Sequence, residues 1–430
     1  MAGGGGGRTG PAIVTGVEFL FSLERFGMKF GLANIARLCE ALGHPERAFP
    51  SLIIAGTNGK GSVTAMVDAA LRAAGHRSAR YTSPHLVRLS ERFVIGGREV
   101  AADQLEAAAS RVRRTAETLV AQGALDALPT FFEATTAAAF VLFRDAGVRI
   151  AVLEVGLGGR LDATNIVSPV AAAIVSIDLD HQAQLGNTIA SVAAEKAGVI
   201  KDGIPVVCGP LPPEALEVVE RVCAERRAHL IRTDLDSTLA ERVDAIPLSL
   251  PGEHQKANAA VAMKLLDIVD ADPALGLRVS GLAVRAGLST ARWPGRLERF
   301  HWRGCRMILD AAHNPAGARS LAWYLRSTER HGVTLVFGAM QDKAIVEMLR
   351  ALAPAAASII CTLAPSARAA APAELARLAH QFTADVQVVD DPLDAVRAAC
   401  AAGRTVVIAG SIFLIGPLRE RLARDILESS

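Results

Sequence analysis

The sequence predicts an α/β protein with parallel-rich sheets, because short apolar strands alternate with amphipathic helical stretches along most of its 430 residues. Half of the chain is apolar (51%) and 21% is charged, which favours a folded over a disordered protein. A chain of this length exceeds what one hydrophobic core usually supports. We therefore expect at least two α/β domains.

The first series of elements begins with the apolar strand SLIIAG (51–56), and a helix is expected to follow at 62–74. Further buried strands are expected at 149–156, 169–177 and 204–209, with helices at 102–122, 131–146, 187–200 and 213–227. The pattern ends at RAGLSTARWPGR (285–296), which contains Gly and Pro, has no clear period and is interpreted as a linker region.

A second series of strands follows that stretch. It is expected at 306–312, 333–339, 358–363, 386–390 and 405–410. The resulting domain prediction is a glycine-rich tail (1–12), a nucleotide-binding domain (13–290), a linker (291–296) and a smaller α/β domain (297–430).

Composition excludes several classes of protein. The net charge is +2 without a lysine/arginine block, and aromatic residues make up only 4%, so we expect no nucleic-acid partner. The start lacks the apolar core of a signal peptide, and no apolar run approaches the roughly 20 residues of a membrane span. Six scattered cysteines without a C-x-x-C pair indicate reduced thiols rather than a disulfide framework or a zinc cluster. We expect a soluble, cytoplasmic protein.

The stretch IIAGTNGKGSV (53–63) has the components of a phosphate-binding loop: a strand, glycines, a lysine, a hydroxyl and a following helix. It departs from the common template G-x-x-x-x-G-K-[ST] at two places, since Ile54 replaces the first glycine and Gly61 follows the lysine. The hydroxyl therefore comes one position late, at Ser62. An ordinary glycine-rich turn is the alternative, but the strand–loop–helix context favours a phosphate site.

Acidic side chains follow two predicted strands, where ligand groups of open α/β sheets usually lie. Glu154 ends the apolar run IAVLEVG, and Asp178, Asp180 and His181 follow AAAIVSI. These groups suit Mg²⁺, which prefers carboxylate oxygens and hydroxyls near phosphates. A loop carboxylate and a structural or surface histidine remain alternatives, and Glu195-Lys196 on a helix is normally a solvated pair.

Together these stretches resemble the dihydrofolate synthase/folylpolyglutamate synthase family of the Mur ligase superfamily. The matching segments run in order through most of the chain: LERFGMKFGLANIARLCEALG (23–43), AGTNGKGSV (55–63), YTSPHLVRLSERF (81–93), TFFEATTAAAF (130–140), LEVGLGGRLDATN (153–165), SIDLDHQAQLG (176–186), AAEKAGVIK (193–201), LPGEHQKANAAVA (250–262), WPGRLE (293–298), LDAAHNPAGA (309–318) and VFGAMQDK (336–343). The family uses the loop form G-T-N-G-K-G-[ST], so the resemblance also accounts for both departures from the common template. QAQLG (182–186) has glutamine where some relatives have an aromatic residue.

The resemblance implies a Mur-ligase-like ATP-binding central domain and a Rossmann-like C-terminal glutamate-ligase domain. It also implies an ATP-dependent amide ligase that activates a carboxylate as an acyl phosphate for attack by the amino group of L-glutamate. The expected ATP-binding residues are Gly56, Thr57, Asn58, Gly59, Lys60, Gly61, Ser62, Asn258, Arg296, Asp310 and His313. Lys60, Glu154, His181 and Lys196 are the expected catalytic residues.

One or two Mg²⁺ sites are implied, with Ser62, Ser83, Glu154 and His181 as ligands, and Lys196 matches a lysine that is carboxylated in relatives. Expected folate-binding residues are His85, Phe132, Arg160 and Asp162, and expected glutamate-binding residues are Asp342, Lys343 and Ser411. The implied substrates are dihydropteroate, tetrahydrofolate or folylpolyglutamates, and L-glutamate, handled by a monomer.

Three alternative functional hypotheses fit the sequence less well than this family does. A UDP-muramyl amino-acid ligase would carry a UDP-binding domain before the loop, where only 55 residues precede Gly56. A P-loop kinase or switch would have Ser or Thr directly after the lysine, and a non-catalytic nucleotide-binding protein would not need Lys60, Glu154, His181 and Lys196 together. Between a bifunctional enzyme and a monofunctional folylpolyglutamate synthase, the resemblance to bacterial members favours the bifunctional form.

Overall fold

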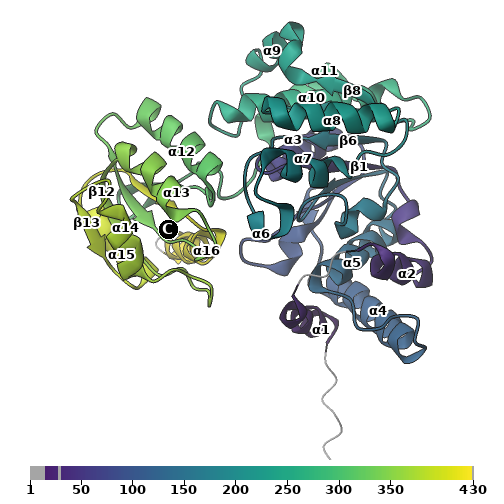
Figure 1. Cartoon of the computed structure of the whole chain (residues 1–430), viewed down its shortest axis with the longest axis horizontal. Helices are drawn as coiled ribbons and strands as arrows, with labels where there is room; N and C mark the ends of the chain where they lie inside the picture. Colours follow the sequence, from purple (N-terminus) through teal and green to yellow (C-terminus); the bar gives the residue numbers. More distant parts are fainter. Residues whose placement is uncertain (1–14, 28–30, 429–430) are drawn as a thin grey trace, which may run out of the picture.

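The computed structural model describes residues 15–27 and 31–428, so the expected tail at 1–12 lies outside the described residues. The described chain forms two units side by side, each built around its own sheet (Figure 1). The first unit is drawn in purple to teal and the second in green to yellow. The segment between α11 and β9 connects them.

The first unit is organised by a sheet of eight strands from the described chain, in the order β4-β3-β2-β5-β1-β6-β7-β8. Its strands are β1 (Ser51–Ala55), β2 (Ser78–Tyr81), β3 (Phe93–Ile95), β4 (Arg98–Glu99), β5 (Ile150–Glu154), β6 (Ala171–Ile174), β7 (Pro205–Cys208) and β8 (His229–Arg232). The strands from β2 to β8 in this order run parallel, and β3 pairs antiparallel with both β2 and β4. Continuous burial of β1 and β5 explains their uninterrupted apolar sequences.

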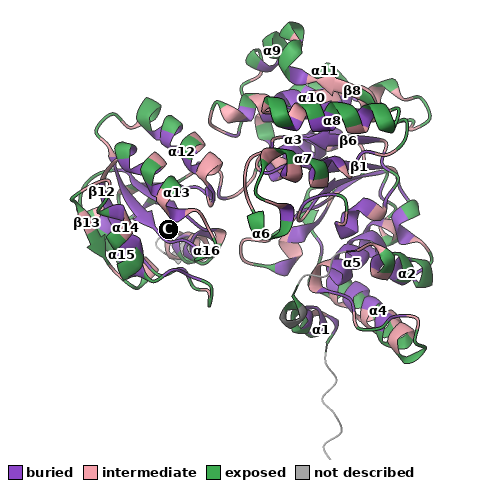
Figure 2. Ribbon diagram, viewed as in Figure 1, coloured by how far each residue is buried: buried purple, intermediate pink, exposed green. Residues whose placement is uncertain are grey.

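Helices cover both faces of this sheet. They are α1 (Gly16–Ser22), α2 (Ala33–Ala41), α3 (Lys60–Ala73), α4 (Ala102–Ala121), α5 (Phe131–Asp145), α6 (Gln182–Leu185), α7 (Ile189–Ala197), α8 (Pro213–Glu225), α9 (Ser237–Asp244), α10 (His254–Ala271) and α11 (Gly281–Thr290). Because side chains alternate along a strand, Leu52 and Ile54 of β1 pack in the apolar cluster of α3, α10 and α11, whereas Ile53 packs on the opposite face with Val199. Figure 2 shows the resulting buried layer along the sheet.

The second unit contains a sheet of six strands from the described chain, in the order β13-β12-β11-β14-β10-β9. Its strands are β9 (Glu298–Trp302), β10 (Cys305–Leu309), β11 (Val333–Phe337), β12 (Ala356–Cys361), β13 (Val386–Val388) and β14 (Val406–Ala409), and only β9 pairs antiparallel. Its helices are α12 (Pro315–Thr328), α13 (Ile345–Leu352), α14 (Pro372–Ala379), α15 (Pro392–Ala401) and α16 (Ile412–Glu428). One buried cluster covers each face, with α12, α13 and α14 on one and α15 and α16 on the other.

Short 3₁₀ helices complete the described secondary structure: η1 (Leu23–Phe26), η2 (Pro45–Arg47), η3 (Leu89–Arg92), η4 (Ala163–Ile166), η5 (Thr233–Leu235) and η6 (Ala353–Ala355). The helical pattern at 23–43 therefore becomes two separate helices, η1 and α2, with residues 28–30 outside the described chain. No helix in the described ranges combines the length and apolarity needed to cross a membrane.

The linker interpretation of 285–296 was wrong for its first half, because residues up to Thr290 belong to α11. A Cβ atom on Gly287 would lie 2.7 Å from Ala70 Cβ, so α11 packs very closely on α3 at this glycine. The buried residues of α11 recur at helical spacing, but two of them, Ala283 and Gly287, are small and weaken the apolar pattern in the sequence. The shorter segment after it joins the two sheets.

The expectation of reduced cysteines was also wrong for one pair. Cys305 of β10 and Cys400 of α15 form a disulfide with a Cα–Cα distance of 5.7 Å. The two cysteines are 95 residues apart, so their spacing gave no indication of pairing. Cys39, Cys208, Cys223 and Cys361 are free and buried.

Candidate active site

The loop between β1 and α3 has the backbone form of an anion site. The helix begins at Lys60 itself, two residues earlier than the sequence predicted, and Gly59 caps it with φ 84°. Left-handed φ is readily adopted by glycine, which explains this glycine before the lysine. The first-turn N–H groups of a helix have no intrahelical acceptor, so α3 presents donors and a positive dipole end at this loop.

The loop is fixed to the end of β6. Thr57 N donates to Ser176 O (2.8 Å), and Asn58 N donates to Ser176 Oγ (3.0 Å). The Thr57 hydroxyl donates to Asp178 O and accepts from Asp178 N, both at 3.0 Å. The N–H groups of Thr57 and Asn58 are thus already used, and the start of α3 remains to contact phosphate.

Two lysine side chains share one acceptor in this loop. Lys60 Nζ donates to Gly56 O at 3.0 Å, and Lys196 Nζ, from α7, donates to the same oxygen at 2.9 Å. Burial, together with the neighbouring charge of Lys60, lowers the pKa of Lys196 to about 7. Burial also lowers the pKa of Lys60, while Glu154 and Asp180 oppose that effect.

Candidate metal ligands follow three strands near β1 in the sheet order. Ser83 follows β2, Glu154 ends β5 and His181 follows β6. Glu154 accepts from Ser83 N at 3.3 Å, and burial raises the pKa of Glu154 to about 7 against the charges of Lys60 and Arg296. Burial lowers the pKa of His181 to about 4, which keeps its imidazole neutral, the form that binds metals.

The Ser83 hydroxyl is a buried polar atom with no hydrogen-bond partner among the described residues. Such groups are costly unless something pairs with them, so this oxygen fits a cation next to Glu154. Within the described chain there is no cluster of three or more His, Cys, Asp or Glu side chains suited to a metal. A metal here would therefore need hydroxyl oxygens as well as Glu154 and His181.

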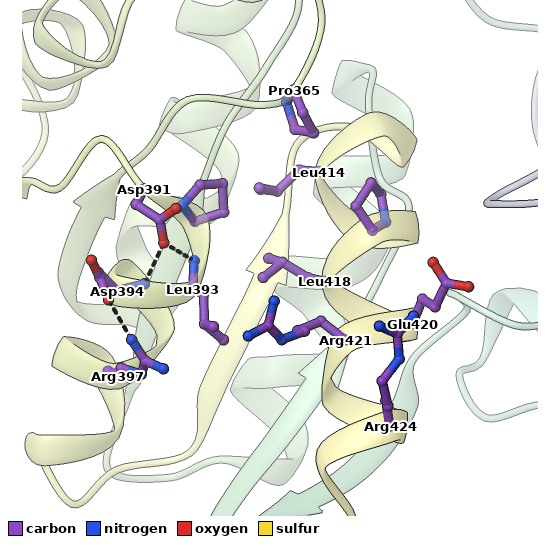
Figure 3. Close-up of a pocket in the computed structure, with 12 residues that line it drawn as sticks. Pro365, Asp391, Leu393, Asp394, Arg397, Leu414, Leu418, Glu420, Arg421 and Arg424 are labelled. Atoms are coloured by element: carbon purple, nitrogen blue, oxygen red, sulfur yellow. Dashed lines mark hydrogen bonds and ion pairs between the residues drawn. The ribbon is translucent and has the colours of Figure 1, made fainter.

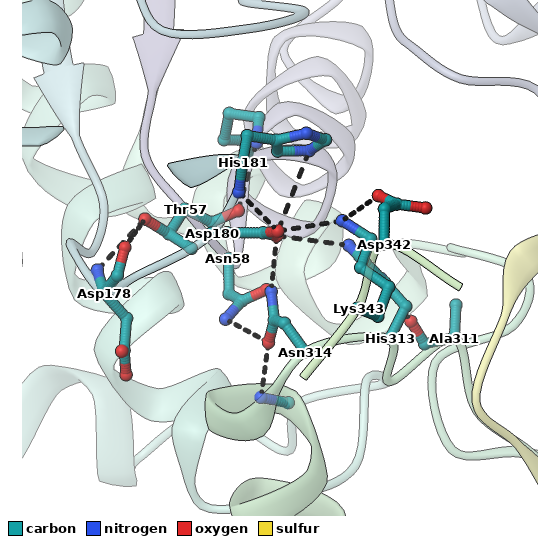
Figure 4. Close-up of polar contacts among 12 residues, drawn as sticks. Thr57, Asn58, Asp178, Asp180, His181, Ala311, His313, Asn314, Asp342 and Lys343 are labelled. Carbon is teal, nitrogen blue, oxygen red and sulfur yellow. Dashed lines mark hydrogen bonds and ion pairs between the residues drawn. The ribbon is translucent and has the colours of Figure 1, made fainter. Parts of the chain in front are cut away.

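Asp180 joins the two units (Figure 4). Its carboxylate accepts from Lys343 Nζ (2.8 Å) and from Asn314 Nδ2 (2.9 Å), both from the second unit, and from the backbone N–H of His181 (2.8 Å). Burial acts to raise the pKa of Asp180, but the hydrogen bond from His313 and the charges of His181 and Lys343 hold it well below its usual range.

The phosphate loop itself contacts the second unit through an amide pair. Asn58 Nδ2 donates to Asn314 Oδ1 (3.2 Å), and Asn314 Nδ2 lies 3.1 Å from Asn58 Oδ1. Asn314 is also the N-cap of α12, accepting from Gly317 N. On the exposed side, Arg319 of α12 forms an ion pair with Asp178 at 2.6 Å.

The remaining expected nucleotide-binding residues surround this junction. Asn258 of α10 lies so close to Gly59 that a Cβ atom there would clash with its amide. It donates to Gln255 Oε1 (2.9 Å), and Gln255 Nε2 donates to Ser62 Oγ (3.3 Å). Arg296 interacts electrostatically with Lys60 and Glu154.

On the second unit, Asp310 is buried and accepts from the backbone N–H groups of Leu297 (2.8 Å) and Ala312 (2.9 Å). Burial raises its pKa, and the charge of Arg296 opposes the rise. His313 Nδ1 donates to Ala311 O (2.8 Å), and its Nε2 lies 3.6 Å from Asp180. The sequence-predicted ATP residues of both units thus lie around one junction.

The expected glutamate-binding residues lie at strand ends of the second unit. Asp342 and Lys343 follow β11, and their charged atoms are 3.9 Å apart. Ser411 follows β14, is buried, and its Oγ accepts from Phe413 N at 3.1 Å. Arg368, which was not among the expected binding residues, lies beside this group. Its carbonyl accepts from Gln341 N (2.9 Å), and its guanidinium lies 5.6 Å from the Phe413 ring centroid.

The expected folate-binding residues are partly engaged within the protein. His85 Nδ1 accepts from Arg92 Nε (2.9 Å), and burial together with this guanidinium lowers the pKa of His85 to about 4. The Phe132 ring lies over Gly156, where a Cβ atom would be 2.6 Å from Cζ. These two side chains follow β2 and open α5, respectively, beside the candidate metal ligands.

Asp162 and Arg160 have contacts that do not require a ligand. Asp162 accepts from the backbone N–H groups of Gly156, Leu157 and Thr164 at 2.9–3.0 Å, so it holds the loop after β5 in shape. Arg160 is exposed and forms an ion pair with Glu195 at 2.7 Å. Glu195 and Lys196 therefore do not form the solvated pair that is usual on a helix: Glu195 pairs with Arg160, and Lys196 is buried.

A separate hollow of about 580 Å³ lies in the second unit between α15 and α16 (Figure 3). Three arginines and three carboxylates line it together with apolar residues: Asp391, Asp394, Arg397, Glu420, Arg421 and Arg424. Asp391 caps α15 and Asp394 pairs with Arg397 at 2.7 Å, so several of these charges are already matched. None of the predicted site residues lines this hollow.

Sequence reasoning assigned no role to Asn314, Gln255, Ser176, Trp293 or Arg368. Asn314 and Gln255 lie inside matched motifs, so their positions next to His313 and His254 were the available signal. The sequence predicted Asp180 only as a carboxylate after a strand, whereas in the structure it accepts from two side chains of the second unit, Lys343 and Asn314.

The chain is similar to known proteins over nearly its whole length. Residues 295–412 match the family described as "Mur ligase, glutamate ligase domain". The chain is 32% identical over 425 residues to the dihydrofolate synthase/folylpolyglutamate synthase of Bacillus subtilis, covering 93% of this chain and 96% of that protein. A Haloferax volcanii relative named as a probable bifunctional folylpolyglutamate synthase/dihydropteroate synthase is 34% identical over 96% of this chain, which spans 50% of that longer protein.

Solved structures of the same family superpose on this chain. Folylpolyglutamate synthase of Mycobacterium tuberculosis, complexed with ADP and AMPPCP, superposes with a TM-score of 0.85 at 33% identity, covering 95% of this chain and 99% of that one. E. coli FolC in complex with DHPP and ADP gives 0.85 at 30% identity, covering 97% and 99%. A bifunctional folylpolyglutamate synthase/dihydrofolate synthase with Mn, AMPPNP and L-glutamate bound gives 0.83 at 32% identity, covering 97% and 100%.

Identity of this level over nearly the whole length, on the same two-sheet fold, establishes the relationship. The chain therefore belongs to the dihydrofolate synthase/folylpolyglutamate synthase family of Mur ligases and is an ATP-dependent amide ligase.

Proposed function

We propose that this ligase joins L-glutamate both to dihydropteroate, forming dihydrofolate, and to reduced folates, extending their glutamate tail. The observation that carries the proposal is the junction at Gly56, where Lys60 and Lys196 share one buried acceptor beside Glu154. Directly across it, Asp180 contacts Lys343 of the second unit. Charge is thus concentrated where a phosphoryl group would move between ATP and a carboxylate.

ATP binding is assigned to both units. The start of α3 and Lys60 would hold the phosphates, with Ser62 beside them, and Asn258, Arg296, Asp310 and His313 would contact the nucleotide. Arg296 suits phosphate because its guanidinium presents paired donors. We assign 13–290 as the ATP-binding domain, 291–296 as the linker and 297–430 as the glutamate-ligase domain.

Divalent cations fit this site, since the buried Ser83 hydroxyl lacks a partner next to Glu154. Ser62, Ser83, Glu154 and His181 would hold Mg²⁺, which when bound neutralises phosphate charge. The protein's own contribution is to keep His181 neutral and to place Glu154 in a dry environment, where its carboxylate binds strongly once deprotonated.

Lys196 is assigned as a carboxylated lysine. Carbon dioxide reacts with a neutral amine, and the lowered pKa of Lys196, about 7, leaves this amine largely neutral at pH 8. The carbamate would replace a donor with two acceptor oxygens beside Gly56 O, so the side chain would turn toward cationic partners such as Lys60.

The chemical sequence proposed has two steps. A substrate carboxylate oxygen attacks the γ-phosphorus of ATP, releasing ADP and forming an acyl phosphate. The neutral amino group of L-glutamate then attacks the acyl carbon, phosphate leaves, and the amine loses a proton, giving the amide. Lys60 and Arg296 stabilise the charge on the transferring phosphoryl group by position.

L-glutamate is assigned to the second unit, with Lys343, Asp342 and Ser411 as its binding residues. Lys343 Nζ already binds one carboxylate, that of Asp180, at 2.8 Å, which is the chemistry needed to hold a substrate carboxylate. The folate is assigned to His85, Phe132, Arg160 and Asp162. Phe132 offers an aromatic face, and Asp162 acts through the loop that it holds.

Release of ADP by the purified protein tests the proposal. It should require ATP, Mg²⁺ and L-glutamate, and should proceed with dihydropteroate and separately with tetrahydrofolate, each product gaining one glutamate by mass. Turnover with tetrahydrofolate alone would make the protein a monofunctional folylpolyglutamate synthase. Turnover with neither acceptor would refute the folate assignment.

A further inference from the structure

The connection between the two units contacts the phosphate loop through Trp293. A Cβ atom built on Gly61 would lie 2.5 Å from Cε2 and 2.7 Å from Nε1 of this indole, distances that real Cβ atoms do not show. Gly61 is not among the residues with left-handed φ, so its backbone conformation does not require glycine. The three atoms nearest to a side chain at this position all belong to the indole, so the indole excludes one.

The indole is itself held in place. The Arg80 guanidinium stands over the Trp293 ring, 5.7 Å from its centroid, and is paired with Asp68 at 3.2 Å. Asp68 is fully buried and also accepts from Ser78 Oγ at 2.6 Å. Trp293 additionally packs against the apolar cluster of α3, α10 and α11. A ring held this way cannot easily move aside for a larger residue at 61.

The residues after Trp293 are fixed to the second unit. Gly295 O accepts from Ala311 N (2.7 Å), and Leu297 N donates to Asp310 (2.8 Å). Arg296, assigned to the nucleotide, lies between these two anchors. One short segment therefore rests on the phosphate loop at Trp293 and on the Asp310 loop at Leu297.

We propose that Trp293 is a positioning residue that fits the linker to the phosphate loop at Gly61 and so sets Arg296 and the second unit relative to ATP. This inference rests on the ATP site proposed above. It also explains why a hydroxyl directly after the lysine, common in other phosphate loops, is absent here: the indole occupies its space, and Ser62 supplies the hydroxyl instead.

The test is a double-mutant cycle on the full-length protein with Gly61→Ser, Trp293→Leu and the double variant. ATP affinity is measured by calorimetry with Mg²⁺, and KM for ATP and kcat are measured separately. Other phosphate loops commonly have Ser directly after the lysine, so a serine there does not by itself prevent ATP binding. Gly61→Ser should therefore weaken ATP binding about tenfold when Trp293 is present and much less when it is replaced by Leu. Trp293→Leu should raise KM for ATP more than it lowers kcat, and the double variant should bind ATP better than Gly61→Ser alone.

Trp323→Leu, on the exposed face of α12, is the matched control for loss of an indole and should leave ATP affinity unchanged. Gly61→Ser with ATP affinity within about twofold of wild type would overturn the inference, as would effects that simply multiply in the double variant.

A second measurement remains decisive if a variant fails to fold. Replacing Trp302 and Trp323 by Phe leaves Trp293 as the single tryptophan, because the sequence has three. ATP should then change its fluorescence emission, and unchanged emission at saturating ATP would overturn the inference. A wild-type protein that binds no ATP would refute the proposed function itself, whereas ATP binding without coupling refutes only the role of Trp293.

Discussion

Replacing Glu154 by Gln should stabilise the ligand-free protein while abolishing its activity. Glu154 is buried at 5% exposure, and its pKa is raised from the ordinary 4.5 to about 7, first by burial. Because a pKa difference of one corresponds to about 1.4 kcal/mol, the ionised carboxylate costs the folded state about 3 kcal/mol above pH 7. Gln keeps the shape and can still accept from Ser83 N, but it carries no charge.

The pH dependence of this gain follows from the direction of the shift. Between pH 4.5 and 7 the folded protein binds more protons at Glu154 than the unfolded chain does, so wild-type stability falls as pH rises through this window. The Gln variant lacks this loss. Its advantage should therefore be full at pH 8, and it should nearly vanish at pH 4.5 and below.

Thermal unfolding without metal or nucleotide measures the effect. With an unfolding entropy of about 2.1 cal/mol/K per residue, a gain of about 3 kcal/mol in a unit of about 278 residues (13–290) corresponds to an increase in Tm of roughly 5 °C at pH 8. Glu374→Gln, at an exposed ion pair on α14, is the matched control and should shift Tm by less than about 1 °C. A Glu154→Gln variant that is no more stable than wild type at pH 8 would refute the reasoning, and an active variant would refute the assigned role of Glu154.

Three further predictions concern single side chains. Lys196→Ala should lose at least about 99% of ligase activity, and acetate or formate should restore part of it by supplying the missing oxygens; an unimpaired variant would exclude a carbamate role. Asp68→Ala should lower the free energy of unfolding by about 3–5 kcal/mol in chemical denaturation, because it leaves the half-buried Arg80 unpaired; a loss below about 1 kcal/mol would contradict this. Lys343→Met should raise KM for L-glutamate at least about tenfold with KM for ATP within about twofold, and equal rises in both would argue for a general closure defect instead.

The parallel core was predictable from the sequence because its central strands are buried on both faces. SLIIA and IAVLE are continuous apolar runs, and the structure places them side by side as β1 and β5. β8 was missed for the opposite reason: HLIR lies at the sheet edge, is only partly buried and follows no apolar pattern. β2 was missed as well, although it is internal and mostly buried, because SARY contains no continuous apolar run. Prediction therefore succeeded where a strand is a continuous apolar run and failed where it is not.

The candidate site shows the same division. Groups at strand ends, such as Glu154 and His181, could be predicted to lie at the same edge of the sheet, because its strands β5 and β6 run parallel to β1. The Asp180–Lys343 contact could not, since it depends on how the second unit sits against the first, and 163 residues separate the partners. The contact between Trp293 and Gly61 could not be predicted either, because no local sequence pattern relates a linker residue to a loop more than half the chain away.

We expect the two lysines at Gly56 to have separate roles, because their charged neighbours differ. Burial lowers the pKa of Lys60, whereas Glu154 and Asp180 favour its charged form, which suits contact with phosphate. Burial, and after it the charge of Lys60, lowers the pKa of Lys196 to about 7. Both lysines donate to one carbonyl oxygen, and under the proposed function Lys60 would act as the cation for ATP and Lys196 as the reactive amine. Losing the positive charge at Lys60 should therefore raise the pKa of Lys196 and suppress its carboxylation, so the two functions cannot be altered independently.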